Sequence, residues 1–404
     1  MRLGLFVLAL ATTGCIGFGR VPRRAERAQL RQSPQFEQRK FRNPEPMYIK
    51  VVGVLRGAPR GIQTEPEQPL PVVSRRGEEF AQPPASGLRA TWLGHSSVLL
   101  EIDGKRVLTD PHWGPRSSPF RHAGPKRWYA PPLPLEEVPA VDAVLISHDH
   151  YDHLGHDTIG RIAAWQTRFI VPLGVGGHLE RWGVPTERIT EVDWWDEVDL
   201  GGVRIACVPS RHASGRRMVT RDRTLWAGYA LLGDEHRVYF SGDTGLFPAM
   251  ETIGTTYGPF DLTMIEVGAY DDNWPDWHLG PEQAVLAHLM VRGRALLPIH
   301  WGLFRLAPHG WTEPIERVHA KAKAIGVRVA TPRPGESIEL ATLEATTRWW
   351  PDIRWQTEDQ NPIRATRKGD RDDRMDHDAL FERFAPGRPD ADDAPTTPHP
   401  RSSP

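Results

Sequence analysis

The sequence predicts an α/β fold in which two mixed β-sheets pack face to face and helices cover their outer sides. Within residues 88–342, apolar runs of strand length alternate with segments of helical periodicity. Hairpin patterns open each half of this region, and helical patterns come later in each half. The composition, 39% hydrophobic and 25% charged, is typical of a globular protein.

The elements of this fold can be placed in order along the chain. Strands are expected at residues 90–100 and 106–108, on either side of the turn-forming pair Asp103-Gly104. The apolar run at 143–146 is typical of a buried strand, and a helix is expected after the turn at 148–153. The pattern then predicts strands at 168–172, 203–208, 226–232, 238–240, 262–267 and 295–299, helices at 175–182, 281–291 and 314–325, and a closing strand pair at 327–330 and 337–340.

Residues 1–15 have the pattern of a secretory signal. A positive start is followed by an apolar stretch at 3–11, which is too short to span a membrane, and by small residues before Cys15. A cysteine after a small residue resembles the bacterial lipoprotein signal, although Thr12 stands where such signals usually carry leucine. We expect lipidation of Cys15 and anchoring in the bacterial cell envelope, facing the periplasm. Plain secretion and a retained anchor are the alternatives.

The segments that flank residues 88–342 do not have the pattern of a core. Residues 16–87 combine an arginine-rich tether with an extended arm rich in proline and glycine, which can wrap the domain. The tether is either solvated or a basic stripe on anionic headgroups. Residues 343–404 are charged and poor in apolar side chains from about residue 357, so a disordered tail is expected.

Net charge and cysteine content exclude two classes of protein. The net charge of −1 provides no overall positive field for nucleic acid, so no nucleic-acid partner is expected. The two cysteines, Cys15 and Cys207, do not form a disulfide framework. Cys207 lies in a strand-like run and is expected to be a small buried core residue. The sequence makes no prediction of oligomeric state.

The most informative feature of the chain is the run His-Asp-His-Tyr-Asp-His at residues 148–153. Neutral imidazoles suit zinc, and adjacent carboxylates can hold a second ion. Three further candidates each follow a strand-like run, and strand ends are where layered α/β proteins place their sites. The seven candidate ligands are His148, His150, Asp152, His153, His212, Asp243 and His300. The alternative for the run alone, a solvated histidine-rich loop, is disfavoured because the rest of the chain supplies the missing ligands.

Several motifs together resemble one known family. The histidine run, the later His212, Gly242-Asp243-Thr244-Gly245 and the final His300 resemble the metallo-β-lactamase fold, an αββα sandwich. The following blocks are similar to one branch, the N-acyl-phosphatidylethanolamine-hydrolysing phospholipase D family: Thr91-Trp92-Leu93-Gly94-His95-Ser96, Leu108-Thr109-Asp110-Pro111, Gly124-Pro125-Lys126-Arg127, Trp194-Trp195, Gly258-Pro259-Phe260-Asp261-Leu262, Gly268-Ala269-Tyr270 and Ile299-His300-Trp301-Gly302. The resemblance covers residues 88–340.

The resemblance implies a dizinc hydrolase, with iron or manganese possible in place of one zinc. One zinc is expected on His148, His150 and His212, the second on Asp152, His153 and His300, and Asp243 is expected to bridge them. Two cations about 3.5–4 Å apart can activate water near neutral pH and neutralise charge on phosphoryl oxygens. The implied reaction releases N-acylethanolamine and phosphatidic acid from a phospholipid substrate.

Besides the ligand Asp152, His278 is the expected catalytic residue. It matches a family histidine near the site and is expected to donate to the phosphate or the leaving oxygen, with a local cap or solvent-exposed role as the alternative. His95 is expected to support the site, and Asp110 to orient a ligand histidine as an outer carboxylate. Asp149 is expected to be solvated or bonded to backbone. Arg121 and the adjacent His122 can face a phosphate.

Two other functions remain open. The first is a hydrolase of the same fold that acts on a lactone or on another phosphodiester. The second is a non-catalytic envelope lipoprotein that uses metal only to hold its fold. A complete set of seven ligands disfavours the second, because structural zinc sites are usually closed and four-coordinate. Tryptophans near the candidate site favour an apolar substrate, and these are Trp113, Trp128, Trp274, Trp277 and Trp301.

Overall fold

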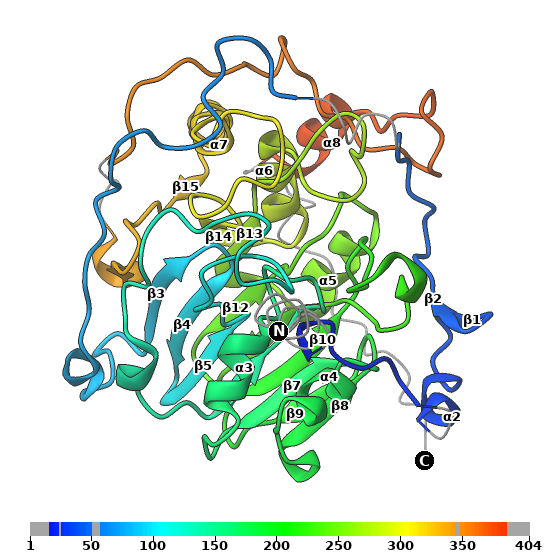
Figure 1. Cartoon of the computed structure of the whole chain (residues 1–404). Coiled ribbons are helices and arrows are strands. Elements are labelled where there is room, and N and C mark those ends of the chain that lie inside the picture. The colour runs from blue at the N-terminus through cyan, green and yellow to red at the C-terminus, as the bar shows by residue number, and fades with distance from the viewer. Residues whose placement is uncertain (1–15, 24–25, 51–56, 344–347, 386–404) are drawn as a thin grey trace, which may run out of the picture.

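The computed structural model describes residues 16–23, 26–50, 57–343 and 348–385, so the predicted signal at 1–15 lies outside the described residues. Two seven-stranded sheets pack face to face in these residues, with helices on both outer sides (Figure 1). This arrangement confirms the predicted αββα sandwich. In order across the first sheet lie β16 (Ser337–Ile338), β3 (Leu88–Gly94), β4 (Ser97–Ile102), β5 (Lys105–Thr109), β6 (Ala143–Leu145), β7 (Arg168–Pro172) and β8 (Ile189–Val192).

The second sheet has the same size and a similar mixture of parallel and antiparallel pairs. In order across it lie β15 (Arg328–Val329), β14 (Gly293–Ile299), β13 (Phe260–Glu266), β12 (Arg237–Phe240), β11 (Gly228–Leu232), β10 (Arg204–Val208) and β9 (Glu197–Asp199). Strands β12, β13 and β14 run parallel, so their carboxyl ends lie at one edge of the sheet. That edge carries two of the candidate ligands.

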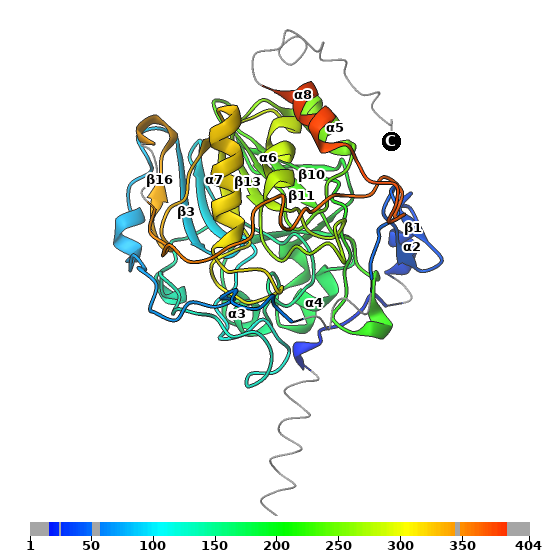
Figure 2. The ribbon, with the colours of Figure 1, turned by 90° about the horizontal axis from the view of Figure 1, so that it is seen from above.

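The helices divide between the two outer faces, as Figure 2 shows. Helices α3 (His156–Ile162) and α4 (Gly176–Arg181) belong to the first sheet, and α5 (Ala249–Tyr257), α6 (Pro281–Met290) and α7 (Glu313–Ile325) to the second. Strand β4 has an apolar centre that is buried on both faces. Val98 and Leu100 pack between the sheets while Leu99 packs toward α3, since successive side chains point to opposite faces.

Several sequence predictions differ from the structure, and the strands expected to form a closing pair, β15 and β16, lie in different sheets. The strand expected at 90–100 is two strands, β3 and β4, because the chain turns at His95, whose φ is 55°. Helix α5 is not predicted by the sequence, since its threonines and glycine have low helix propensity and mask its periodicity. No helix among the described residues is long and apolar enough to cross a membrane.

The prediction of a disordered tail is wrong for residues 348–385, which pack on the domain. Trp350, Ile363 and Phe381 are buried, and helix α8 (His377–Phe384) contacts α6. A few widely spaced apolar residues anchor this charged segment, a pattern that average composition does not reveal. The arm at 57–87 and the tail run beside each other over one edge of the molecule in Figure 1.

Asp276 joins the arm, the tail and the core, and its loss should be costly. Its buried carboxylate accepts hydrogen bonds from the backbone N–H groups of Tyr48 and Thr366, both at 2.7 Å, and pairs with Arg211 at 3.1 Å. Asp276→Ala would leave a buried guanidinium without its carboxylate, so we expect about 3–5 kcal/mol of destabilisation. Urea unfolding measures this, with the half-exposed Asp272→Ala as the control. Equal stabilities for the two variants would contradict the assignment.

Glu191 gives the stability a dependence on pH. Burial raises its pKa to about 7, although it accepts a hydrogen bond from the backbone N–H of Gly176 at 2.7 Å. This pKa exceeds the value of 4.5 in the unfolded chain. The contribution of Glu191 to the free energy of unfolding is therefore greatest below pH 4.5 and is lost as pH rises toward 7. Glu191→Gln should therefore raise Tm at about pH 8 by a few degrees, and hardly at all near pH 4.5. An equal rise at both values, measured by calorimetry, would refute this assignment.

Candidate metal centre

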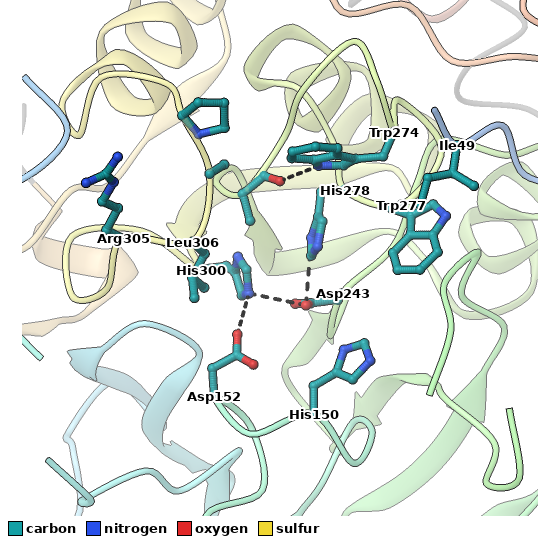
Figure 3. Close-up of a pocket in the computed structure, with 13 residues that line it drawn as sticks. Ile49, His150, Asp152, Asp243, Trp274, Trp277, His278, His300, Arg305 and Leu306 are labelled. Carbon is teal, nitrogen blue, oxygen red and sulfur yellow. Dashed lines mark hydrogen bonds and ion pairs between the residues drawn. The ribbon is translucent and has the colours of Figure 1, made fainter. Parts of the chain in front are cut away.

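The candidate ligands meet at one edge of the sandwich, between the two sheets. The turn at 148–153 follows β6, His212 follows β10, Asp243 follows β12 and His300 follows β14. Figure 3 shows His150, Asp152, Asp243 and His300 projecting into the same cavity. The structure therefore brings all seven sequence-predicted ligands together, and whether they bind metal stays a prediction.

Three histidines and Asp243 form the first group of possible ligands. His148 Nε2 lies 2.8 Å from His150 Nδ1, and His212 Nε2 lies 3.2 Å from the same atom. The Oδ2 atom of Asp243 is 3.8 Å from His148 Nε2 and 3.7 Å from His212 Nε2. Four ligand atoms within 4.8 Å of one another can surround a single cation.

The second group lies on the other side of Asp243. Asp152 Oδ2 is 3.3 Å from His153 Nε2 and 3.2 Å from His300 Nε2. The Oδ2 atom of Asp243 lies 3.1 Å from His153 Nε2 and 3.2 Å from His300 Nε2. The Asp243 carboxylate therefore lies in contact with both groups. His95 Nε2 contacts Asp152 Oδ2 at 2.9 Å, as the expected support of the site.

The chemistry of these side chains fits divalent cations. Burial lowers the pKa of His148 and His212 well below the usual value, which favours the neutral imidazole that binds metal. In the second group burial is outweighed by the Asp243 carboxylate and hydrogen bonds, which raise the pKa of His300 to about 10. This part of the site thus favours positive charge. The Oδ1 atom of Asp243 is buried without a hydrogen-bond partner in the described part of the chain.

The backbone around the site is held in an unusual conformation. His95, Asp110 and His300 have positive φ values of 55°, 34° and 62°. Non-glycine residues reach this region at a cost of about 1–3 kcal/mol each, and such residues cluster at functional sites. The backbone N–H of His300 donates to the carbonyl oxygen of His95 at 3.0 Å, which joins two of these turns.

Asp110 is the outer carboxylate that the sequence predicted. It accepts hydrogen bonds from the backbone N–H and hydroxyl of Ser147, at 2.7 and 2.6 Å, and lies 2.7 Å from His153 Nδ1. This contact orients the His153 ring with Nε2 toward Asp243. His212 is oriented similarly, since its Nδ1 lies 2.8 Å from the carbonyl oxygen of Trp277.

The weaker predictions for Asp149, Arg121 and His122 do not all have the same outcome. Asp149 accepts a hydrogen bond from the backbone N–H of Gly215 at 2.6 Å, as expected, but it is buried rather than solvated and contacts His178. Arg121 and His122 are exposed and line a separate cavity, so the structure does not bring them to the site. Their spacing from the ligands gave no reliable indication of position.

His278 lies in the site, beside a carboxylate that the sequence analysis missed. Its Nδ1 is 2.8 Å from Glu266 Oε2 and 3.7 Å from Asp243 Oδ2. Burial lowers the pKa of His278 to about 4, and burial together with Asp243 raises the pKa of Glu266 well above its usual value. Glu266 is the last residue of β13, and its charge at the end of an apolar run was the available signal.

The site opens into a cavity of about 430 Å³ whose walls combine polar and apolar side chains. Trp274, Trp277, Leu306 and Ile49 line it, and Ile49 comes from the N-terminal arm. Arg305 adds one guanidinium to the wall (Figure 3). Of the tryptophans noted in the sequence, Trp274 and Trp277 line this cavity. The arrangement can hold a molecule with a charged centre and apolar groups.

Comparison with known proteins finds relatives of this chain. A family model described as a β-lactamase superfamily domain matches residues 105–301. An uncharacterised protein of Mycobacterium tuberculosis is 45% identical over 338 residues, 80% of this chain and 89% of its own. An N-acyl-phosphatidylethanolamine-hydrolysing phospholipase D of Caenorhabditis elegans is 38% identical over 256 residues, 60% of this chain and 70% of its own. The structure of an isothiocyanate hydrolase from Delia radicum gut bacteria shares the fold with a TM-score of 0.51, at 18% identity over 62% of this chain and 98% of its own.

Proposed function

The chain belongs to the β-lactamase superfamily of metal-dependent hydrolases, in the family that includes the N-acyl-phosphatidylethanolamine-hydrolysing phospholipases D, and we propose that it cleaves such a lipid. The proposed substrate class is N-acyl-phosphatidylethanolamine. Hydrolysis of the phosphodiester bond on the ethanolamine side gives N-acylethanolamine and phosphatidic acid. The rest of the proposal concerns the metals and the residues that position the substrate.

One observation carries the choice of substrate. The candidate ligands lie at the base of a cavity whose walls include Trp274, Trp277 and Leu306, together with Arg305. A phosphodiester lipid needs a cationic centre for its phosphate and apolar walls for its acyl groups. A small polar substrate such as a lactone would gain little from two indole rings. The cavity therefore favours a lipid over the alternative substrates.

The proposed cofactor is a pair of zinc ions. His148, His150 and His212 would hold one, Asp152, His153 and His300 the second, and Asp243 both. When bound, two such cations supply an activated water molecule and neutralise negative charge on phosphoryl oxygens. The contacts of Asp110 and Trp277 hold His153 and His212 in the orientations that this assignment requires.

His278 and Arg305 are the proposed contacts to substrate. The Nδ1 atom of His278 lies on Glu266, which leaves Nε2 as the ring nitrogen available to the cavity. A donor at that position can hydrogen-bond a phosphoryl oxygen or the departing oxygen. Arg305 lies in the same wall, where its positive charge can attract the anionic lipid headgroup.

The direct test uses the purified full-length chain carrying Cys15→Ser, loaded with zinc, and N-acyl-phosphatidylethanolamine in detergent micelles. Mass spectrometry should detect N-acylethanolamine and phosphatidic acid, and a chelator should abolish both. Phosphatidylcholine in the same micelles is the control lipid. No product from protein shown to hold two metal ions would overturn the lipid assignment, and a lactone or a different phosphodiester would be tested next. Hydrolysis that survives complete metal removal would overturn the role of the cations.

A further inference from the structure

The start of the described chain is bound to the domain and is not a free tether. The carbonyl oxygen of Ile16 accepts a hydrogen bond from Trp182 Nε1 at 2.9 Å. The carbonyl oxygen of Gly17 accepts from the Arg216 guanidinium at 2.7 Å, and the backbone N–H of Arg20 donates to His178 Nδ1 at 2.9 Å. The point at which the chain leaves toward residue 15 is therefore fixed on the surface.

Arg216 links this start to the turn that carries the candidate ligands. The same buried guanidinium donates to the carbonyl oxygens of Asp149 and Leu154, at 2.7 and 2.8 Å. The backbone oxygen of Arg216 also accepts a hydrogen bond from the hydroxyl of Tyr151, within the ligand turn. Arg216 therefore binds both residue 17 and the turn that carries the candidate ligands, and this holds the two segments in a fixed relative position.

Exposed apolar side chains gather around this attachment. Val219 is 81% exposed, Ile16 42% and Phe120 41%. Phe18 makes an edge contact with Phe120 at 5.8 Å between ring centroids, and the Arg217 guanidinium lies 4.2 Å from the Phe18 ring centroid. These contacts join Phe18, Phe120 and Arg217. We call these three residues the N-terminal rim, together with their near neighbours in the chain, Ile16, Arg121, Val219 and Arg221. In Figure 2 the start of the described chain lies at the lower edge of the molecule.

The rim reaches the mouth of the cavity. The guanidinium of Arg221 lies over the Trp277 ring, 4.6 Å from its centroid, and Trp277 lines the cavity that contains His278. Val219 stands between Arg217 and Arg221 in the short helical turn η5 (Met218–Thr220). A surface that touched the exposed Val219 side chain would therefore lie beside the entrance to the site.

The charge of the rim favours an anionic partner. Arg121 and Arg217 are exposed, and neither makes an ion pair within the described residues. Some exposed arginines elsewhere are paired, such as Arg204 with Glu197 at 3.0 Å and Arg294 with Asp261 at 2.7 Å. Unpaired arginines beside exposed aliphatic and aromatic groups are the combination that binds the headgroup region of an anionic membrane.

We propose that the N-terminal rim docks the protein on an anionic phospholipid bilayer, with the mouth of the cavity facing the lipid. The described chain begins on this surface at Ile16, so a lipid on the preceding residue, Cys15, would attach the membrane beside the rim. The proposal rests on the proposed function only in its purpose, because an enzyme that cleaves a membrane lipid must take it from the bilayer. Docking itself needs no catalysis.

The apolar part of the rim is tested by vesicle binding without substrate. The full-length chain carrying Cys15→Ser is sedimented with vesicles of phosphatidylcholine and phosphatidylglycerol in equal parts. Val219→Asp combined with Phe120→Ser should weaken binding at least about tenfold. Trp195→Ser is the matched control, since Trp195 is 37% exposed and stacks on Tyr257 away from the rim. Thermal unfolding of each variant establishes that it is folded.

The charged part of the rim is tested by lipid composition. Arg217→Gln should weaken binding to the mixed vesicles about fivefold and leave binding to pure phosphatidylcholine unchanged. Arg204→Gln, which removes a paired exposed arginine, should change neither. Unchanged binding by folded rim variants would overturn the docking proposal and leave the proposed reaction standing. Normal vesicle binding by a protein that does not hydrolyse the lipid would support the docking proposal and overturn the proposed reaction.

Discussion

Asp243→Asn is expected to lower turnover by at least about 10³-fold and to leave the protein folded. Its Oδ2 atom is 3.1 Å from His153 Nε2, 3.2 Å from His300 Nε2 and 3.7 Å from His212 Nε2, so one carboxylate serves both groups. An amide is neutral and a weaker ligand, so the variant should lose both cations or hold them loosely. No other described carboxylate contacts histidines of both groups.

The measurement combines turnover of N-acyl-phosphatidylethanolamine, metal content of the purified protein and thermal unfolding. Asp352→Asn is the control, because its side chain is 89% exposed and pairs only with Arg348 among the described residues. The control should retain activity and metal. Hydrolysis by Asp243→Asn at the parent rate would show that the cations are not shared at this carboxylate.

The positions of the ligands could be predicted because strand ends are visible in the sequence. His212, Asp243 and His300 each follow an apolar run, and parallel strands bring their carboxyl ends to one edge. The local sequence pattern is therefore sufficient to predict which residues lie together at the site. The fold class follows from the same runs, since strands that are apolar throughout, such as β6, must be buried on both faces.

Glu266 could not be assigned to the site because its role depends on strand register. Strand β13 pairs in parallel with β14 so that Glu266 lies opposite Ile299, next to His300. The sequence gives each strand but not the pairing between them. A charged residue at the end of an apolar run is equally typical of a strand that ends in solvent, so only the structure distinguishes the two.

Long-range contacts account for the other differences. Ile49 reaches the cavity from an arm that has no periodicity, and the tail is held by isolated residues such as Trp350 and Phe381. Each contact joins segments far apart in the chain, so no local window contains both partners. The tether at residues 16–20 is similar, because its polar backbone atoms bind buried side chains of α4 and of the loop at Arg216.

His278→Ala is expected to lower kcat by about 10²–10⁴-fold while KM and metal content stay close to those of the parent. The ring lies in the cavity wall with Nδ1 on Glu266, so the substitution would remove the proposed hydrogen-bond donor to the substrate. His236→Ala is the control, since that ring pairs with Asp103 outside the cavity. Loss of metal by His278→Ala would mean that the residue is a ligand and not a donor.

Glu266 separates a positioning role from a purely structural one. Glu266→Gln retains an acceptor for the Thr244 backbone N–H and a partner for His278 Nδ1, whereas Glu266→Ala retains neither. If Glu266 acts by orienting His278, the alanine variant should approach the kcat of His278→Ala and the glutamine variant should recover much of the loss. Combining His278→Ala with Glu266→Ala should then cost little more than His278→Ala alone, because the two side chains act as one unit. Additive losses in this cycle would instead place Glu266 in direct support of Asp243 or His300, and His278 would have to act without it.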